Sequence, residues 1–267
     1  MVKVYPNGND FYEENSSFLL ENKYTEPFFR FDSPLLTEAG KEEYAIRIQK
    51  GSACLLAMLV EPYNILLYGE KALAGELVNF LTSNGYRIKD YLCSIEMGDE
   101  LIRYFGKEGY EFRLSLGMDF MEATQKTAPT SEKIELAGEG DVDELYEMTC
   151  CFIRDCGLSD VAKKDRIQQT LKDYRILRKD GKIASFAKIH EWSDADTKIS
   201  TVYTRDAFRN QGCGRAVVGS VVNEIIDSGR IAALNVDQKN PISNHLYSSL
   251  GFRKIFSQGV YALNTEE

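Results

Sequence analysis

The sequence predicts an α/β protein with two domains, and three observations support this. The chain has 267 residues, 43% of them hydrophobic, which is enough for one large core or two smaller ones. Short apolar runs of strand length alternate with helix-length runs along most of the chain. A polar, proline-containing stretch without apolar periodicity, residues 122–133, interrupts this alternation and is the predicted linker. We therefore expect domains at residues 1–127 and 128–267.

In the second domain, turn and capping residues divide the chain into clear elements. Lys179-Asp180-Gly181 between two apolar runs predicts a hairpin, and Gly229 and Gly251 each end a predicted helix. The predicted elements are a helix from Asp141 to about Arg154, a helix at Val161–Lys172, strands at Tyr174–Arg178 and Ile183–Trp192, a turn at Ser193–Asp196, a strand at Ile199–Tyr203, a helix at Val217–Ile226, a strand at Ile231–Val236, a helix opened by Asn240 and ended by Gly251, and a strand from Phe252.

The most informative segment is the glycine-rich run from Arg209 to Ala216, which follows a predicted strand and opens a helix. Gly212 and Gly214 permit a left-handed backbone and close approach of a ligand. The first N–H groups of a helix have no intrahelical partner, so the segment predicts a phosphate or pyrophosphate site. It is not a Walker loop, because no Lys-Ser/Thr pair follows, and a Rossmann loop would need glycine where Val217 stands. Taken alone, the segment is equally compatible with a plain strand-to-helix turn.

A second motif downstream changes this interpretation. The pattern N-x-x-A-x-x-L-Y-x-x-x-G-F is matched by Asn240, Leu246, Tyr247, Gly251 and Phe252. Together with the loop, which fits [RQ]-x-x-G-x-[GA], this resembles the GNAT superfamily of acyl-CoA-dependent N-acetyltransferases, from near Ile134 to the end of the chain. The resemblance implies a mixed, mostly antiparallel central sheet with helices on both faces.

The resemblance also implies a reaction and its site. The co-substrate would be acetyl-CoA, without a metal, and the acceptor a primary amine of a small molecule, amino acid or peptide. Transfer would be direct, in a ternary complex. The residues implied to bind CoA are Val202, Tyr203 and Thr204 through the backbone beside pantetheine, Arg209, Asn210, Gln211, Gly212, Cys213, Gly214 and Arg215 around the pyrophosphate, and Asn240 at the start of the last helix.

Tyr247 matches the tyrosine that protonates the departing thiolate in this superfamily. A phenol is protonated at neutral pH and can donate, although an aromatic residue at helical spacing can also simply pack in the core. The general base stays open among Glu191, His190, Asp237 and a water chain. Two alternative functions also stay open: transfer of a longer acyl group, as in glycine-acyltransferase-like enzymes, and a non-catalytic CoA-binding regulatory module.

The first domain has no glycine-rich loop of this kind, but its pattern resembles the second. The predicted elements are a strand at Asn64–Gly69, a helix at Ala72–Leu81, a strand at Ile88–Ile95, a helix at Asp99–Phe105 and a strand at Phe112–Met118. This order favours a degenerate GNAT-like repeat, with an unrelated α/β cap as the alternative. The aromatic segment Phe28–Asp32 is expected to be a strand or loop packed on the core.

Composition excludes several classes of protein. The net charge of −9 argues against a nucleic-acid partner. There is no apolar run of membrane-spanning length and no signal-peptide pattern at the N-terminus, so we expect no membrane partner and a cytoplasmic location. The six cysteines lack metal-ligand spacing and are expected to be reduced packing residues; a thiol nucleophile among Cys150, Cys151 and Cys156 is the weaker alternative. A homodimer stays open.

Overall fold

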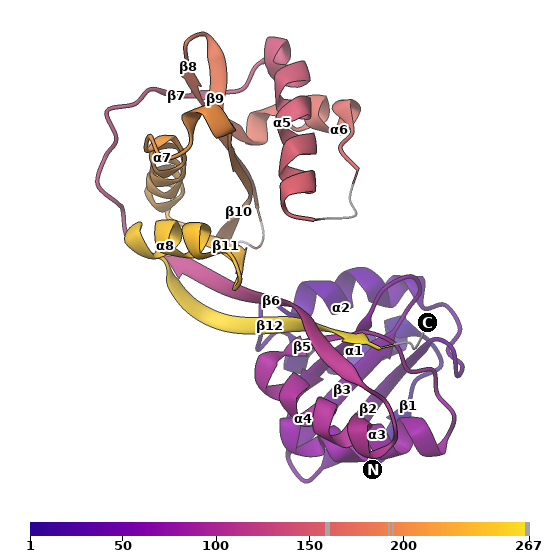
Figure 1. Cartoon of the computed structure of the whole chain (residues 1–267). Helices are drawn as coiled ribbons and strands as arrows, with labels where there is room; N and C mark the ends of the chain where they lie inside the picture. Colours follow the sequence, from indigo (N-terminus) through magenta and orange to yellow (C-terminus); the bar gives the residue numbers. More distant parts are fainter. Residues whose placement is uncertain (158–160, 192, 194, 265–267) are drawn as a thin grey trace. The chain divides into compact units, whose positions relative to one another are not determined.

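The computed structural model describes residues 1–157, 161–191, 193 and 195–264. Trp192, expected to end a strand, and Asp194, expected in the next turn, lie outside the described residues. The chain forms two compact units, each described separately below (Figure 1). Unit 1 comprises residues 1–119 and the chain from Phe256 onward, and unit 2 comprises Phe120–Ile255.

The elements of unit 1 follow the order expected for the first domain, with five more at its start. They are β1 (Val2–Val4), α1 (Gly8–Leu19), α2 (Glu26–Asp32), β2 (Tyr44–Lys50), β3 (Ala53–Leu59), β4 (Ile65–Gly69), α3 (Ala74–Ser83), β5 (Tyr91–Ser94), α4 (Ile95–Lys107) and the first part of β6 (Phe112–Ala123). Short 3-10 turns follow α2 at Ser33–Leu35 and precede α3 at Lys71–Leu73.

The elements of unit 2 repeat this order of strands and helices. They are β7 (Ile134–Leu136), α5 (Val142–Asp155), α6 (Lys164–Gln169), β8 (Tyr174–Lys179), β9 (Lys182–Glu191), β10 (Asp196–Thr204), α7 (Cys213–Asp227), β11 (Ile231–Asp237), α8 (Pro241–Ser249) and the first part of β12 (Arg253–Leu263). Three further 3-10 turns lie at Glu139–Asp141, Leu171–Asp173 and Asp206–Phe208.

Each unit has a mixed, mostly antiparallel sheet, as expected. In unit 1 the strand order is β1-β2-β3-β4-β5-β12, and in unit 2 it is β11-β10-β9-β8-β7. Within these two runs, β4 with β5 and β10 with β11 are the parallel pairs, and the other pairs are antiparallel. The strand beside β5 is therefore the last strand of the chain, with Gln258–Tyr261 opposite Tyr91–Ser94.

Helices cover both faces of each sheet. In unit 1, α3 and α4 pack on one face through side chains such as Leu77 and Leu101, and α1 and α2 pack on the other through Phe11 and Phe29. In unit 2, α7 and α8 share one core with the sheet, and α5 and α6 share a second core that includes Phe186. Burial of these apolar faces, at about 25 cal/mol per Å², is the main favourable contribution to folding.

Three features differ from the expectations from sequence. The division near Asp119 and Phe256 replaces the expected one at 127/128, because β6 runs without a break through the start of the predicted linker and the last strand pairs with β5. Phe28–Asp32 belongs to helix α2, which Pro27 opens at its first turn. Strand β5 ends at Ser94, because the Ser94 hydroxyl accepts the Met97 N–H and caps α4 four residues earlier than expected.

Candidate functional site

The glycine-rich loop of unit 2 connects the end of β10 to the start of α7. Asn210 and Gly212 both have left-handed backbones, with φ of 61° and 78°. Gly212 is the N-cap of α7, and its carbonyl accepts the N–H of Ala216 at 2.9 Å. Within the described residues, the N–H groups of Cys213, Gly214 and Arg215 have no hydrogen-bond acceptor. Three unpartnered amides at the positive end of a 15-residue helix form a cradle whose polarity would favour an anion, called the anion cradle below.

The two glycines of this loop are required for different reasons. A Cβ on Gly212 would meet open space, so this position needs glycine for its backbone conformation. A Cβ on Gly214 would lie 3.1 Å from the hydroxyl oxygen of Thr204. That hydroxyl also shares a 2.9 Å hydrogen bond with Ser185, which fixes its position. Gly214 therefore allows the first turn of α7 to pack against the end of β10.

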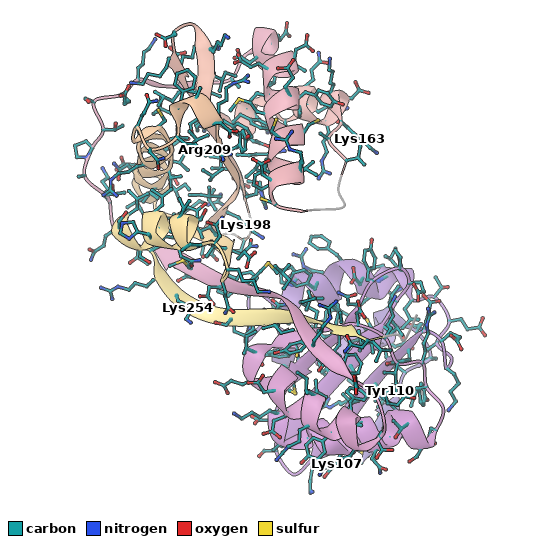
Figure 2. All side chains as sticks on the ribbon, viewed as in Figure 1. Lys107, Tyr110, Lys163, Lys198, Arg209 and Lys254 are labelled. Atoms are coloured by element: carbon teal, nitrogen blue, oxygen red, sulfur yellow. The ribbon has the colours of Figure 1, made fainter. Side chains whose placement is uncertain are left out.

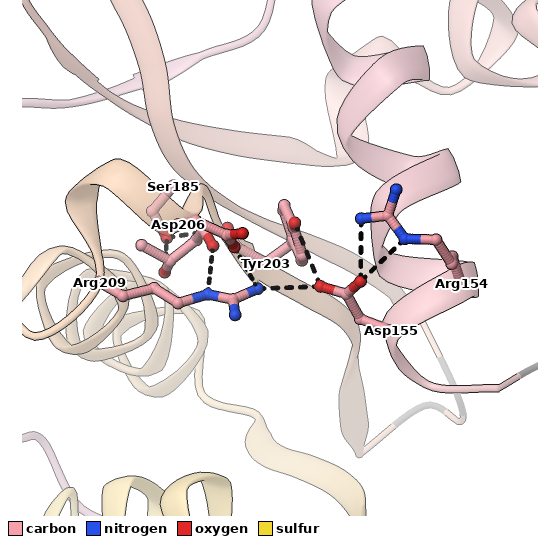
Figure 3. A network of polar contacts seen from close by, with 7 residues as sticks. Arg154, Asp155, Ser185, Tyr203, Asp206 and Arg209 are labelled. Atoms are coloured by element: carbon pink, nitrogen blue, oxygen red, sulfur yellow. Dashed lines mark hydrogen bonds and ion pairs between the residues drawn. The ribbon is translucent and has the colours of Figure 1, made fainter.

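The charged side chains of the loop bind other parts of unit 2 rather than the cradle. The Nε of Arg209 donates to the carbonyl of Thr204, and its Nη2 lies 3.0 Å from the carboxylate of Asp155 and 2.9 Å from that of Asp206 (Figure 3). Figure 2 labels Arg209 among the side chains of unit 2. Arg215 donates to the hydroxyl and carbonyl oxygens of Ser249 at the end of α8. The anion cradle thus consists of backbone amides.

Asp155, which the sequence analysis did not single out, is the second centre of this network. It is the last residue of α5, where the helix dipole disfavours a negative charge. Hydrogen bonds from Arg209 and then Arg154 lower the pKa of its carboxyl group. The Tyr203 hydroxyl donates to the same carboxylate at 3.4 Å. An acidic residue at a helix C-terminus is the sequence signal that could have indicated such a partner.

Strands β10 and β11 diverge beside this loop. They pair only from Asp196 opposite Ile231 to Ile199 opposite Leu234. A register shift between Ile199 and Thr201 marks a bulge on the β9 side of β10 at the same level. Among the described residues, Val202, Tyr203 and Thr204 therefore pair only with β9 and have no β11 partner. Their backbone edge toward β11 is open to an extended ligand, while the side chains of Val202 and Tyr203 pack in the two cores.

Helix α8 follows β11 and carries the second motif. The side chain of Asn240 caps this helix by accepting the N–H of Ser243 at 3.0 Å. The ring of Tyr247 is 8% exposed and packs edge-on against Phe252, with ring centroids 5.8 Å apart. The Tyr247 hydroxyl has no hydrogen-bond partner within the described residues. It is nevertheless not one of the polar side-chain atoms there that are both fully buried and without a partner. The ring is therefore a core residue, and the hydroxyl is largely buried without being fully sealed from solvent.

Comparisons with known proteins agree with this geometry. A family model described as FR47-like protein matches residues 177–261. A GCN5-related N-acetyltransferase from Sphaerobacter thermophilus superposes with a TM-score of 0.67 at 16% identity, over 98% of this chain and 94% of that one. A GNAT-family acetyltransferase from Colwellia psychrerythraea gives a TM-score of 0.64 at 10% identity, over 100% of both chains. The chain has a GNAT fold, as its sequence indicated.

The two-unit organisation is also found in a GNAT protein. A tandem GNAT protein from the clavulanic acid biosynthesis pathway matches over 100% of both chains, with a TM-score of 0.53 at 10% identity. Unit 1 of the present chain has the same order of strands and helices as unit 2. No curated protein matches the sequence. The family signal in the sequence thus lies in the second half, whereas the fold extends over the whole chain.

The three residues predicted as the general base differ in their surroundings. Glu191 is 81% exposed and forms an ion pair with Arg230 at 2.9 Å, as expected of a solvated strand end. His190 lies opposite Lys198, and burial followed by the charges of Lys198 and Lys188 lowers its pKa. The contacts of the described residues link neither of them to Tyr247.

Asp237, at the end of β11, and Tyr247 both interact electrostatically with Cys156. The Asp237 carboxylate raises the pKa of the Cys156 thiol, after burial and Asp155, and Cys156 in turn contributes to the raised pKa of Tyr247. A thiol with a raised pKa is a poor nucleophile at neutral pH, which argues against a catalytic role for Cys156. Among the residues described, no three His, Cys, Asp or Glu side chains gather as a metal site requires, and no helix is long and apolar enough to cross a membrane.

Proposed function

We propose that this chain is an N-acetyltransferase that transfers the acetyl group of acetyl-CoA to a primary amine, with its site in unit 2. The observation that carries the proposal is the row of unpartnered amides at Cys213, Gly214 and Arg215, next to the open edge of β10. A diphosphate fits the amides, and an extended pantetheine amide chain fits a strand edge. The diphosphate and the pantetheine arm of CoA would thus both find matching backbone groups within unit 2.

In the proposed mechanism the residues of this chain position the thioester and manage protons. The amides of Cys213, Gly214 and Arg215 would hold the pyrophosphate, and the backbone of Val202 to Thr204 would align the pantetheine arm. The free amide N–H groups of the Asn240 side chain would contact CoA beside α8. Such positioning replaces a bimolecular encounter by an intramolecular one, the effect on which direct transfer depends.

The bond changes require one proton acceptor and one proton donor. The amine nitrogen attacks the thioester carbonyl carbon, a C–N bond forms, and the C–S bond breaks. The nitrogen loses a proton to Asp237 or to a water chain, and the departing sulfur gains one from the Tyr247 hydroxyl. Burial raises the pKa of Tyr247 to about 12, so the phenol is protonated throughout the neutral range.

Two measurements test the proposal in sequence. Isothermal titration with acetyl-CoA should give micromolar binding that Gly214→Glu abolishes, because the substitution adds a negative charge beside the cradle. Chromatographic detection of free CoA, released with a library of amines, should then show turnover. Binding without turnover would favour a non-catalytic CoA-binding module instead.

A series of acyl-CoAs of increasing chain length separates acetyl transfer from transfer of a longer acyl group. We expect acetyl-CoA to give the highest kcat/KM. A maximum at a longer chain would replace acetyl by that acyl group and leave the rest of the mechanism in place. Failure of acetyl-CoA to bind at millimolar concentration would refute the proposal as a whole.

A further inference from the structure

The face of the unit 2 sheet on which α5 and α6 pack is apolar only in part. Phe186 of β9 and Tyr203 of β10 belong to the core shared with these helices. Side chains alternate between the two faces of a strand, so Lys188 and His190 lie on the same face as Phe186, and both are partly exposed. Lys188 donates to the Thr170 hydroxyl at 3.0 Å, which leaves two of its three ammonium protons. This polar end of the face takes no part in the proposed mechanism.

Lys198 of β10 belongs to the same polar group. It lies opposite His190 in the antiparallel pairing of β10 with β9, and Thr201 lies opposite Lys188. Directly opposite residues of two antiparallel strands point to one face, with Cβ atoms about 4.5–5.5 Å apart. Lys198, labelled in Figure 2, is also partly exposed. Three basic side chains, Lys188, His190 and Lys198, therefore lie together on one sheet face, and we call them the basic cluster.

The basic cluster lies at the point where β10 and β11 separate. Lys198 pairs with β11 one position before the last pair of that ladder, Ile199 opposite Leu234. With the pyrophosphate at the start of α7, the pantetheine arm would run along β10 from Thr204 back toward Ile199. Its thiol end, which carries the acetyl group, would thus lie at the separation of the two strands. The acceptor amine would have to meet the thioester beside the basic cluster.

The basic side chains of the cluster repel one another. Like charges directly opposite on neighbouring strands are destabilising. Burial and then the charges of Lys198 and Lys188 lower the pKa of His190. Burial also lowers the pKa of Lys198 to about 8. Asp173 offsets a smaller part of the lowering for Lys188 and His190, whereas Arg166 adds to it for Lys188. A bound anion would relieve this repulsion, so the cluster is suited to an anionic group.

The anionic group that fits this position is a carboxylate of the acceptor. The diphosphate of CoA has its own partners at the start of α7, at the other end of the pantetheine arm. Ammonium and imidazolium groups form charge-assisted hydrogen bonds to carboxylates. On β11, Asp237 lies on the same face as the cluster, because Leu234 and Val236 pack in the α7 core and side chains alternate. Basic groups on one strand and a carboxylate on the next match the two charges of an amino acid.

We propose that the acceptor is a free amino acid whose carboxylate is bound by the basic cluster, with Lys198 as its partner nearest the thioester. This inference rests on the proposed acetyl transfer and specifies its acceptor. A protonated amine without a carboxylate would meet three basic side chains and be repelled. The N-terminus of a peptide has its carboxylate too far from the amine to compensate. The cluster therefore selects amino acids over simple amines and peptides.

A binding measurement on the full chain tests the carboxylate site without turnover. The chain has two histidines, so the ring resonance of His190 can be assigned in NMR spectra by comparison with His190→Gln. We expect N-acetylglycine to shift this resonance and to raise the pKa of His190, and the uncharged N-acetylglycinamide to do neither. Lys198→Met should weaken the binding of N-acetylglycine about ten- to a hundredfold, the range of one hydrogen bond to a charged group.

A kinetic measurement tests whether this site serves the acceptor. With saturating acetyl-CoA, kcat/KM is measured for the common amino acids and for their amides. We expect the best amino acid to exceed its amide at least about tenfold. Lys198→Met should remove this preference by raising the KM of the acid and leaving that of the amide unchanged. Lys182→Met, at the exposed start of β9, is the matched control and should keep the preference.

Two results would overturn the inference while the proposed function stands. One is a His190 resonance that N-acetylglycine does not shift. The other is turnover in which amides equal the acids, or in which Lys198→Met keeps the wild-type preference. Absence of turnover with every amine would instead refute the proposed acetyl transfer, and the acceptor assignment with it, whatever the NMR titration shows.

Discussion

Replacing Tyr247 by phenylalanine removes one hydroxyl and keeps the ring. The 8% exposed ring and its edge-on contact with Phe252 would both be retained. Because the hydroxyl donates to no described residue, the free energy of unfolding at pH 7 should change by less than about 0.5 kcal/mol. Loss of a general acid should lower turnover by about 10²–10⁴. A residue that only packs would leave turnover unchanged.

The same substitution has a second signature, in the pH dependence of stability. Burial raises the pKa of Tyr247 from 10.0 to about 12 in the native state. Between these values the unfolded chain has released the phenol proton and the native chain has kept it, so stability falls as pH rises. Two pKa units correspond to about 3 kcal/mol. In the wild type this stabilisation is fully present below pH 10 and is lost as pH rises to 12. Tyr247→Phe lacks this pH-dependent stabilisation at every pH.

Two assays measure these effects. Free CoA should be quantified by chromatography, because thiol reagents would also react with the six cysteines. Denaturant unfolding of both proteins at pH 7, 10 and 11.5 gives the difference in stability. Tyr174→Phe, at another buried tyrosine of unit 2, is the control and should turn over normally. If Tyr247→Phe binds CoA and turns over at the wild-type rate, Tyr247 is not the acid.

Three further predictions concern unit 2. Gly214→Ala places a methyl group 3.1 Å from the Thr204 hydroxyl and should weaken CoA binding about tenfold, because it displaces the first turn of α7. Adding Thr204→Ala should restore part of that affinity in calorimetry, and no restoration would contradict the packing argument. A double-mutant cycle of Arg209→Gln and Asp155→Asn should give a coupling of about 0.2–1 kcal/mol in denaturant unfolding, small because both side chains are partly exposed, and a coupling of zero would count against the network. Burial lowers the pKa of Lys198 from 10.5 to about 8, so the unfolded chain binds more protons between these two pH values. The stability of the wild type should therefore rise with pH from 8 to 10.5, whereas that of Lys198→Met should not; melting curves recorded over a pH series measure the difference.

The local features of unit 2 could be predicted from sequence because they depend on short windows of the chain. Asp180 and Gly181 both have positive φ, as the predicted hairpin turn requires, and Gly212 is left-handed at the start of α7. These conformations follow from residues adjacent to one another, where the intrinsic backbone preferences of glycine and aspartate decide the outcome. The left-handed turn at the start of α7 could therefore be predicted without coordinates.

The contacts that complete the candidate site join distant parts of the chain. Arg209 binds Asp155, 54 residues earlier, and no periodicity or capping rule connects the two. The burial of Tyr247 depends on how α8 packs against the sheet, so the sequence left the acid and core-packing interpretations open. The structure shows that the ring packs in the core, and the acid role of the hydroxyl stays a prediction.

The sequence by itself determined the order of elements in unit 2 and the GNAT resemblance, because those depend on backbone preferences and on spacing within short motifs. Only the tertiary structure decided that the last strand pairs with β5 of unit 1, and that β6 extends into the start of the expected linker. Strand partners come from residues far apart in the chain. Their choice depends on which apolar faces can be buried together, a property of the folded chain rather than of any local segment.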